Sequence, residues 1–213
     1  MLDLPGVPAL HKSALLGGCV RLRVPVQARQ MRAEVSRLPA EVWGTTGGRV
    51  GVHRAAEAVW LRGFAPAEGD RPIADREPLD ALPSIRSFLE GALGGRPQRC
   101  LLARLPAGAI ITTHIDQAPY FAKTLRIHVP IETHDAVHMV CAGRVYHMAE
   151  GEVWALDNSS AHAAWNADAT RARTHLICDV VPDAHTLALV AGGERGLGRL
   201  DPEILRRVSP LAA

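Results

Sequence analysis

The sequence Leu125-Arg126-Ile127-His128-Val129 does most to decide the fold expected of this chain. Its side chains alternate strictly, with an apolar set on one side and Arg126 and His128 on the other. Because successive side chains of a β-strand point to opposite faces, the alternation predicts a strand. A strand with one apolar face and one face bearing Arg and His fits the wall of a barrel that encloses polar ligands.

Residues 172–179 (ARTHLICD) repeat this pattern. Arg173, His175 and Asp179 share one face of the expected strand, and Leu176 lies on the other. Two such strands favour a barrel with a polar interior. The alternative is a half-buried antiparallel sheet whose polar face is exposed to solvent.

Both strands lie in a region, Cys100 to Val181, that holds about seven short apolar segments separated by turn residues. Such spacing indicates an all-β sandwich or barrel. The preceding sequence alternates as a strand over 19–26, has helical spacing over 27–38 and 79–93, and predicts a strand ending at Trp60-Leu61-Arg62. We therefore expect a mainly β fold with flanking helices in a single domain, 1–213. Its expected parts are an N-terminal α/β support (about 1–98), a β core (about 99–182) and a helical C-terminal tail (183–213).

Composition narrows the class of protein. The 213 residues are 47% hydrophobic and carry a net charge of +2, which suits one domain with a sizeable core and favours no nucleic-acid partner. The sequence has no run of about 18 apolar residues, so we expect no membrane span. Four scattered cysteines argue against a disulfide framework or a zinc ribbon. Acidic Asp3 and two early prolines argue against a signal peptide, and a cytoplasmic protein is expected.

A candidate metal site begins at His114-Ile115-Asp116. Alone, this triplet favours a strand-end histidine and a turn aspartate, because the spacing arises often by chance in a chain with ten histidines. His162, however, follows the turn-like run 157–160 and can point back into a barrel mouth. Two imidazoles and one carboxylate can hold a non-haem ferrous ion on one face. An arginine such as Arg173 can bind a carboxylate co-substrate with its planar fork of donors.

Arg171 is an alternative to Arg173, since it lies two residues away and shares its face of the strand. We favour Arg173 because the apolar run of the strand follows it directly. Arg171 lies closer to the loop 166–170.

Further motifs occur in order along the chain: ARLPAG at 103–108, His114 and Asp116, LRIHVP at 125–130, MAEGEVW at 148–154, His162, Asn166, and RTHLICD at 173–179. This ordered set resembles the aspartyl/asparaginyl β-hydroxylase family, and bacterial free-proline hydroxylases have a similar layout. The resemblance covers about residues 100–181. It reaches more loosely back to Leu38-Pro39, Trp43, His53-Arg54 and Leu82-Pro83.

The resemblance implies a double-stranded β-helix (a jelly roll, cupin-like). His114, Asp116 and His162 would be the ligands of Fe(II), and Arg173 would bind the distal carboxylate of 2-oxoglutarate. The implied activity is that of a dioxygenase that uses O2 to hydroxylate an amino-acid, peptidyl or amino-acid-derived substrate, with succinate and CO2 as co-products. Asp116 favours hydroxylation over halogenation, because related halogenases lack this carboxylate.

The resemblance also implies that Arg126 and His128 lie beside the other end of the co-substrate. Gln117, Tyr120 and Arg62 are candidate substrate contacts by their location alone. Two other functions remain open on the same barrel, a non-oxygenase metal cupin (isomerase or hydrolase) and a non-catalytic binding or sensor protein. The expected partner is a small molecule or peptide. Neither the identity of the substrate nor the oligomeric state follows from the sequence.

Overall fold

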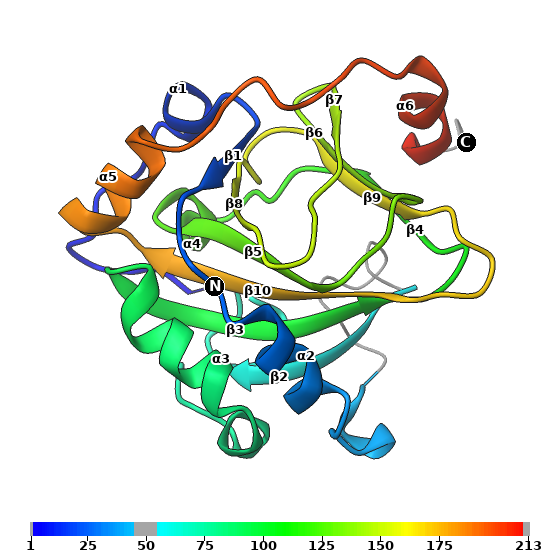
Figure 1. The fold of residues 1–213 in the computed structure, drawn as a ribbon. Coiled ribbons are helices and arrows are strands. Elements are labelled where there is room, and N and C mark those ends of the chain that lie inside the picture. Colours follow the sequence, from blue (N-terminus) through cyan, green and yellow to red (C-terminus); the bar gives the residue numbers. More distant parts are fainter. Residues whose placement is uncertain (1, 45–54, 211–213) are drawn as a thin grey trace.

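Two antiparallel sheets face each other in the computed structural model, which describes residues 2–44 and 55–210 (Figure 1). The major sheet has the strand order β1-β8-β5-β10-β3-β2 and the minor sheet the order β4-β9-β6-β7. The strands are β1 Cys19–Leu22, β2 Glu57–Arg62, β3 Arg96–Leu105, β4 Ile110–His114, β5 Leu125–Glu132, β6 Val137–Cys141, β7 Arg144–Tyr146, β8 Val153–Leu156, β9 His162–Asn166 and β10 Arg173–Val181. The motif residues His53-Arg54 lie outside the described part of the chain.

From β4 onward the chain alternates between the two sheets. β4, β6, β7 and β9 belong to the minor sheet, whereas β5, β8 and β10 belong to the major one. This winding places the inner faces of both sheets against each other, so inward side chains from distant parts of the sequence meet in one interior. The expected mainly β fold with flanking helices is confirmed.

Short helices cover the outside of the sheets. α2 and α3 lie against the major sheet, and α6 lies beside the minor sheet (Figure 1). None of the described helices is long and apolar enough to cross a lipid bilayer. The helices are α1 Lys12–Leu16, α2 Ala28–Val35, α3 Pro83–Ser87, α4 Pro119–Ala122, α5 Ala184–Ala191 and α6 Pro202–Val208, with 3₁₀ turns at Ala40–Val42 and Glu77–Ala81 and a π turn at Phe88–Ala92.

Two expected elements differ from the structure, and proline explains both. The single helix expected over 79–93 is a 3₁₀ turn, α3 and a π turn in succession. Pro83 has no backbone N–H and so begins a new helix instead of continuing the preceding turn. The strand expected over 19–26 ends at Leu22. Pro25 cannot donate a ladder hydrogen bond, which opposes an extension of that strand.

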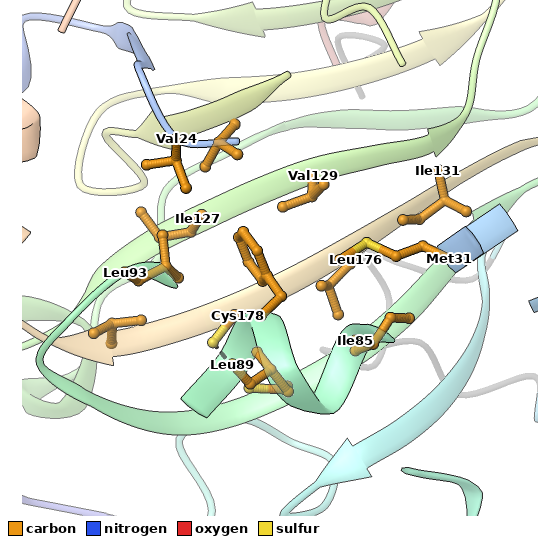
Figure 2. Close-up of a cluster of buried hydrophobic side chains, with 14 of the residues drawn as sticks. Val24, Met31, Ile85, Leu89, Leu93, Ile127, Val129, Ile131, Leu176 and Cys178 are labelled. Carbon is orange, nitrogen blue, oxygen red and sulfur yellow. Dashed lines mark hydrogen bonds between the residues drawn. The ribbon is translucent and has the colours of Figure 1, made fainter. Parts of the chain in front are cut away.

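The main hydrophobic core lies between the outer face of the major sheet and the covering helices (Figure 2). Ile127 and Val129 of β5 and Leu176 of β10 pack there against helical residues such as Ile85. The opposite side of β5 is also buried, since His128 is 5% exposed. The alternation of the two motif strands therefore separates a core face from a buried polar face, and the alternative of a solvent-exposed sheet face is wrong.

Truncation of Leu176 tests the importance of this core. Leu176 is fully buried, so Leu176→Ala leaves a cavity and is expected to lower the free energy of unfolding by about 2–5 kcal/mol. Leu200→Ala is the matched control, because Leu200 is 68% exposed, and its effect should stay within about 0.5 kcal/mol. Urea unfolding followed by circular dichroism measures both. Equal effects of the two variants would contradict the assignment of the core.

Candidate metal centre

The two candidate histidines come from adjacent strands of the minor sheet. His114 ends β4 and His162 begins β9, and the two are direct register partners. Their ring centroids lie 4.2 Å apart. Asp116 follows β4 by two residues, and its backbone N–H donates to the carbonyl of Asn158. One ligand atom from each of His114, Asp116 and His162 lies within 4.8 Å of the others.

Backbone carbonyls orient both imidazoles. The Nδ1 atom of His114 lies 2.8 Å from the carbonyl oxygen of Thr112, and Nδ1 of His162 lies 2.9 Å from that of Ser160. Each Nδ1 therefore carries the proton, and each Nε2 keeps its lone pair. The Nε2 atoms lie 4.0 and 3.9 Å from carboxylate oxygens of Asp116. Two lone pairs and a carboxylate facing one point suit a divalent cation, and hydrogen-bonded ring nitrogens are usual in histidine ligands.

The protonation states of these groups also suit a metal. Burial, reinforced by neighbouring His114, lowers the pKa of His162 to about 4, so the imidazole is neutral near pH 7. Burial alone would raise the pKa of Asp116, but Arg126 and His162 outweigh that effect and hold it well below its usual range. Metal ligands must be deprotonated, and both groups meet this condition at neutral pH.

Asp116 is held by two donors. Its Oδ2 accepts from Nη1 of Arg126 at 2.5 Å and from Nδ2 of Asn158 at 3.0 Å. Arg126 also donates to both oxygens of Asp179, at 2.9 and 3.1 Å. The Oδ1 of Asn158 in turn accepts from Nζ of Lys12 at 2.5 Å. These contacts fix the carboxylate in one orientation.

Sequence reasoning missed Lys12 and Asn158. Asn158 lies in the turn-like run before His162, which was a usable signal. Lys12 lies in an N-terminal stretch without any pattern, yet its side chain is 2% exposed and burial lowers its pKa to about 8.

Arg173 and Arg171 have different surroundings. Arg173 is 2% exposed, and its Nη2 lies 2.7 Å from Nδ1 of His175 and 3.3 Å from Sδ of Met139. The side chain of Arg171 is 63% exposed and pairs with Asp168 at 2.7 Å. Only Arg173 of the two lines the interior cavity.

The cavity between the sheets brings most of the predicted site residues together. Its walls include all three candidate metal ligands and also Arg126, His128 and Arg173. The remaining lining residues are mostly apolar: Ala56, Trp60, Ala67, Glu68, Leu101, Ala103, Ile111, Phe121, Met139, Leu156, Ala163, Ala164 and Ile177.

Gln117, Tyr120 and Arg62 do not line this cavity. Tyr120 is fully buried elsewhere, and its hydroxyl accepts from the backbone N–H of Arg99. Arg62 pairs with Asp75, and Gln117 is exposed. The structure thus does not bring these three candidates together with the residues that line the cavity.

Comparison with known proteins decides the family. A model of the aspartyl/asparaginyl β-hydroxylase family matches residues 28–182, which is more than half of the chain. The chain belongs to the aspartyl/asparaginyl β-hydroxylase family. Its fold is similar to that of a 2-oxoglutarate–Fe(II) oxygenase-family oxidoreductase from Burkholderia pseudomallei, at 15% identity and a TM-score of 0.53, over 87% of this chain and 98% of that one. A Pseudomonas putida prolyl-4-hydroxylase also matches, at 18% identity and a TM-score of 0.49, over 81% and 96% of the two chains.

The expected double-stranded β-helix is thus confirmed. This member of the β-hydroxylase family is an Fe(II)- and 2-oxoglutarate-dependent oxygenase of the hydroxylase type, with O2 as co-substrate. Among residues 2–44 and 55–210, the His114, Asp116 and His162 group is the one arrangement of three such side chains able to hold the metal.

Removal of one imidazole tests the metal centre. His162→Ala should weaken Fe(II) binding by at least about 100-fold, since even loss of an outer partner of a ligand costs 10–100-fold. His138→Ala is the control, because His138 lies on β6 beside Trp165 and lines no part of the cavity. Anaerobic titration calorimetry measures both affinities. Unchanged affinity in the His162 variant would exclude it as a ligand.

Buried imidazoles also predict a pH dependence of stability. Burial, followed by the charge of Arg173, holds the pKa values of His128 and His175 well below their usual range. Below pH about 6.5, His128 and His175 take up protons in the unfolded chain but stay neutral in the folded protein. The free energy of unfolding therefore falls as the pH is lowered. Each group contributes a slope of up to about 1.4 kcal/mol per pH unit. Urea unfolding between pH 7 and 5.5 should show a shallower slope for His175→Asn, and an identical slope would contradict this account.

Proposed function

We propose that His114, Asp116 and His162 hold the Fe(II) of this oxygenase and that Arg173 binds the distal carboxylate of 2-oxoglutarate. The observation that carries the proposal is the environment of Arg173. Its guanidinium is buried, and the described residues provide no carboxylate partner for it. Burial lowers its pKa to about 9, which still leaves the group charged near pH 7.

A buried cation without an anionic partner is costly, and a ligand carboxylate relieves that cost. Guanidinium pairs with a carboxylate through two parallel hydrogen bonds, and this fixes both distance and angle. Nη2 of Arg173 is already oriented by Nδ1 of His175. His175 therefore acts as a positioning residue that holds the fork of donors toward the cavity.

Arg126 and His128 are proposed to lie beside the other end of the co-substrate. Both line the cavity from β5 of the major sheet, and Arg126 donates a hydrogen bond to the carboxylate of Asp116. When bound, iron, 2-oxoglutarate and O2 supply the oxidising chemistry and release succinate and CO2. The protein residues orient the co-substrate, limit access of water and position the C–H bond of the substrate.

The substrate is proposed to be an amino-acid, peptidyl or amino-acid-derived molecule, in line with the family to which the chain belongs. We also propose that residues 1–213 act as one oxygenase domain with an N-terminal support, a β core and a helical tail. A cytoplasmic location is proposed because all four cysteines are free and buried.

Paired arginine variants test the assignment of the co-substrate. Arg173→Met should weaken 2-oxoglutarate binding by at least about tenfold, because loss of a hydrogen bond to a charged group costs about 1.5–3 kcal/mol. Arg171→Met is the control and should bind normally, since its side chain contacts Asp168 on the surface. Calorimetry with the Fe(II)-loaded protein under anaerobic conditions measures both. Loss only in the Arg171 variant would overturn the assignment.

A further inference from the structure

Where β5, β10, β3 and β2 line the cavity, the inner face of the major sheet has a polar half and an apolar half. The polar half holds Arg126 and His128 of β5 and Arg173 of β10, and beyond it the face is apolar again at Trp154 and Leu156 of β8. One row of register partners crosses the face from Trp60 on β2 through Leu101 on β3 and Ile177 on β10 to His128 on β5. Neighbouring strands lie about 4.8 Å apart, so the row extends about 14 Å from His128 to Trp60. His128 belongs to the half that faces the metal and co-substrate residues, and the other three belong to the apolar half.

The apolar half forms a defined cluster on β2 and β3. Ala58, Trp60, Leu101 and Ala103 are between 4% and 8% exposed and pack together, with Ile177 against them. Trp60, Leu101, Ala103 and Ile177 also line the cavity that holds the candidate metal ligands. We call these four residues the apolar floor. When an apolar group of a ligand covers apolar surface that faces a cavity, the free energy of binding becomes more favourable by roughly 25 cal/mol per Å² of surface removed from water.

A loop also lines the cavity beside this floor, and its Ala65 and Ala67 pack against the cluster. Ala67 and Glu68 line the cavity, and the buried guanidinium of Arg99 donates to the carbonyl oxygens of Phe64, Gly69 and Arg71 at 2.5–2.9 Å. These bonds fix the loop around Ala67 and Glu68. Arg99 therefore holds in place the loop that borders the apolar floor.

The two arginines that line the cavity already have partners, in the structure or in the proposed function. Arg126 is paired with two aspartates, and Arg173 lies on the far side of His175 with the proposed co-substrate. A carboxylate or an amide buried against the floor would lose its hydrogen bonds to water, which costs free energy. The floor has a single polar group that could replace them. That group is the buried Nε1–H of Trp60, which has no hydrogen-bond partner among residues 2–44 and 55–210.

We propose that the apolar floor is the substrate subsite, and that it accepts an apolar amino-acid side chain, aliphatic or aromatic, in preference to the side chain of Asp or Asn. This inference rests on the proposed function, because it takes the metal and co-substrate to occupy the polar half. The floor lies beside that half, so the side chain bound on it presents its C–H bonds toward the metal ligands.

Binding of four matched probes tests this subsite. N-acetyl amides of leucine, phenylalanine, asparagine and aspartate are titrated by calorimetry into the protein loaded with Fe(II) and 2-oxoglutarate without oxygen, and into the metal-free protein. We expect the leucine and phenylalanine probes to bind the loaded protein at least about tenfold more tightly than the other two, as apolar pockets discriminate by about this factor. The same order of affinities, at weaker binding, is expected in the metal-free protein.

Substitutions of Trp60 test whether the probes bind on the apolar floor. Trp60→Ala should remove the preference for leucine and phenylalanine, whereas Trp60→Phe should keep most of it. Trp43→Ala is the matched control, because Trp43 stacks on Arg104 and lines no part of the cavity. Tighter binding of the aspartate or asparagine probe would overturn the inference. So would failure of all four probes to bind protein that still binds Fe(II) and 2-oxoglutarate. Failure of Fe(II) or 2-oxoglutarate to bind would instead contradict the proposed function.

Discussion

The ion pairs of Arg126 hold the site together. One guanidinium reaches Asp116 at 2.5 Å and Asp179 at 2.9 Å, and all three groups are largely buried. In this region of low dielectric, the ionised carboxylate of Asp116 favours a divalent cation beside it. Loss of Arg126 would take the guanidinium away from two buried carboxylates, so the metal site and the inner face of the sheet depend on the same interaction.

The two buried arginines of the cavity have different partners. Arg126 pairs with the carboxylates of Asp116 and Asp179, whereas Arg173 contacts the ring of His175. In the proposed function, Arg173 binds the distal carboxylate of 2-oxoglutarate and Arg126 lies beside its other end. His175 and His128 lie between the two arginines with Nδ1 atoms 3.4 Å apart, and both imidazoles are neutral at physiological pH because burial lowers their pKa values. Neutral side chains can fill this space without competing for the charge of the arginines.

The sequence predicts the parts of this site that depend on local geometry. Successive side chains of any strand point to opposite faces. This alternation predicts that Arg126 and His128 lie on the face opposite to Ile127, and that Arg173 lies on the face opposite to Leu176. Contacts between distant segments were beyond such reasoning. Lys12 reaches Asn158 across 146 positions, and Trp60 meets Leu101 only because β2 pairs with β3. The place of the Tyr120 ring likewise depends on the direction of α4, which side-chain alternation along a strand does not specify.

A structure of the protein crystallised without oxygen in the presence of Fe(II) and 2-oxoglutarate tests the central claim most directly. The account predicts one iron ion bound by Nε2 of His114, Nε2 of His162 and a carboxylate oxygen of Asp116. It also predicts that the distal carboxylate of 2-oxoglutarate is paired with the guanidinium of Arg173. An iron ion held by other residues, or a co-substrate carboxylate paired with Arg171 in place of Arg173, would contradict the account.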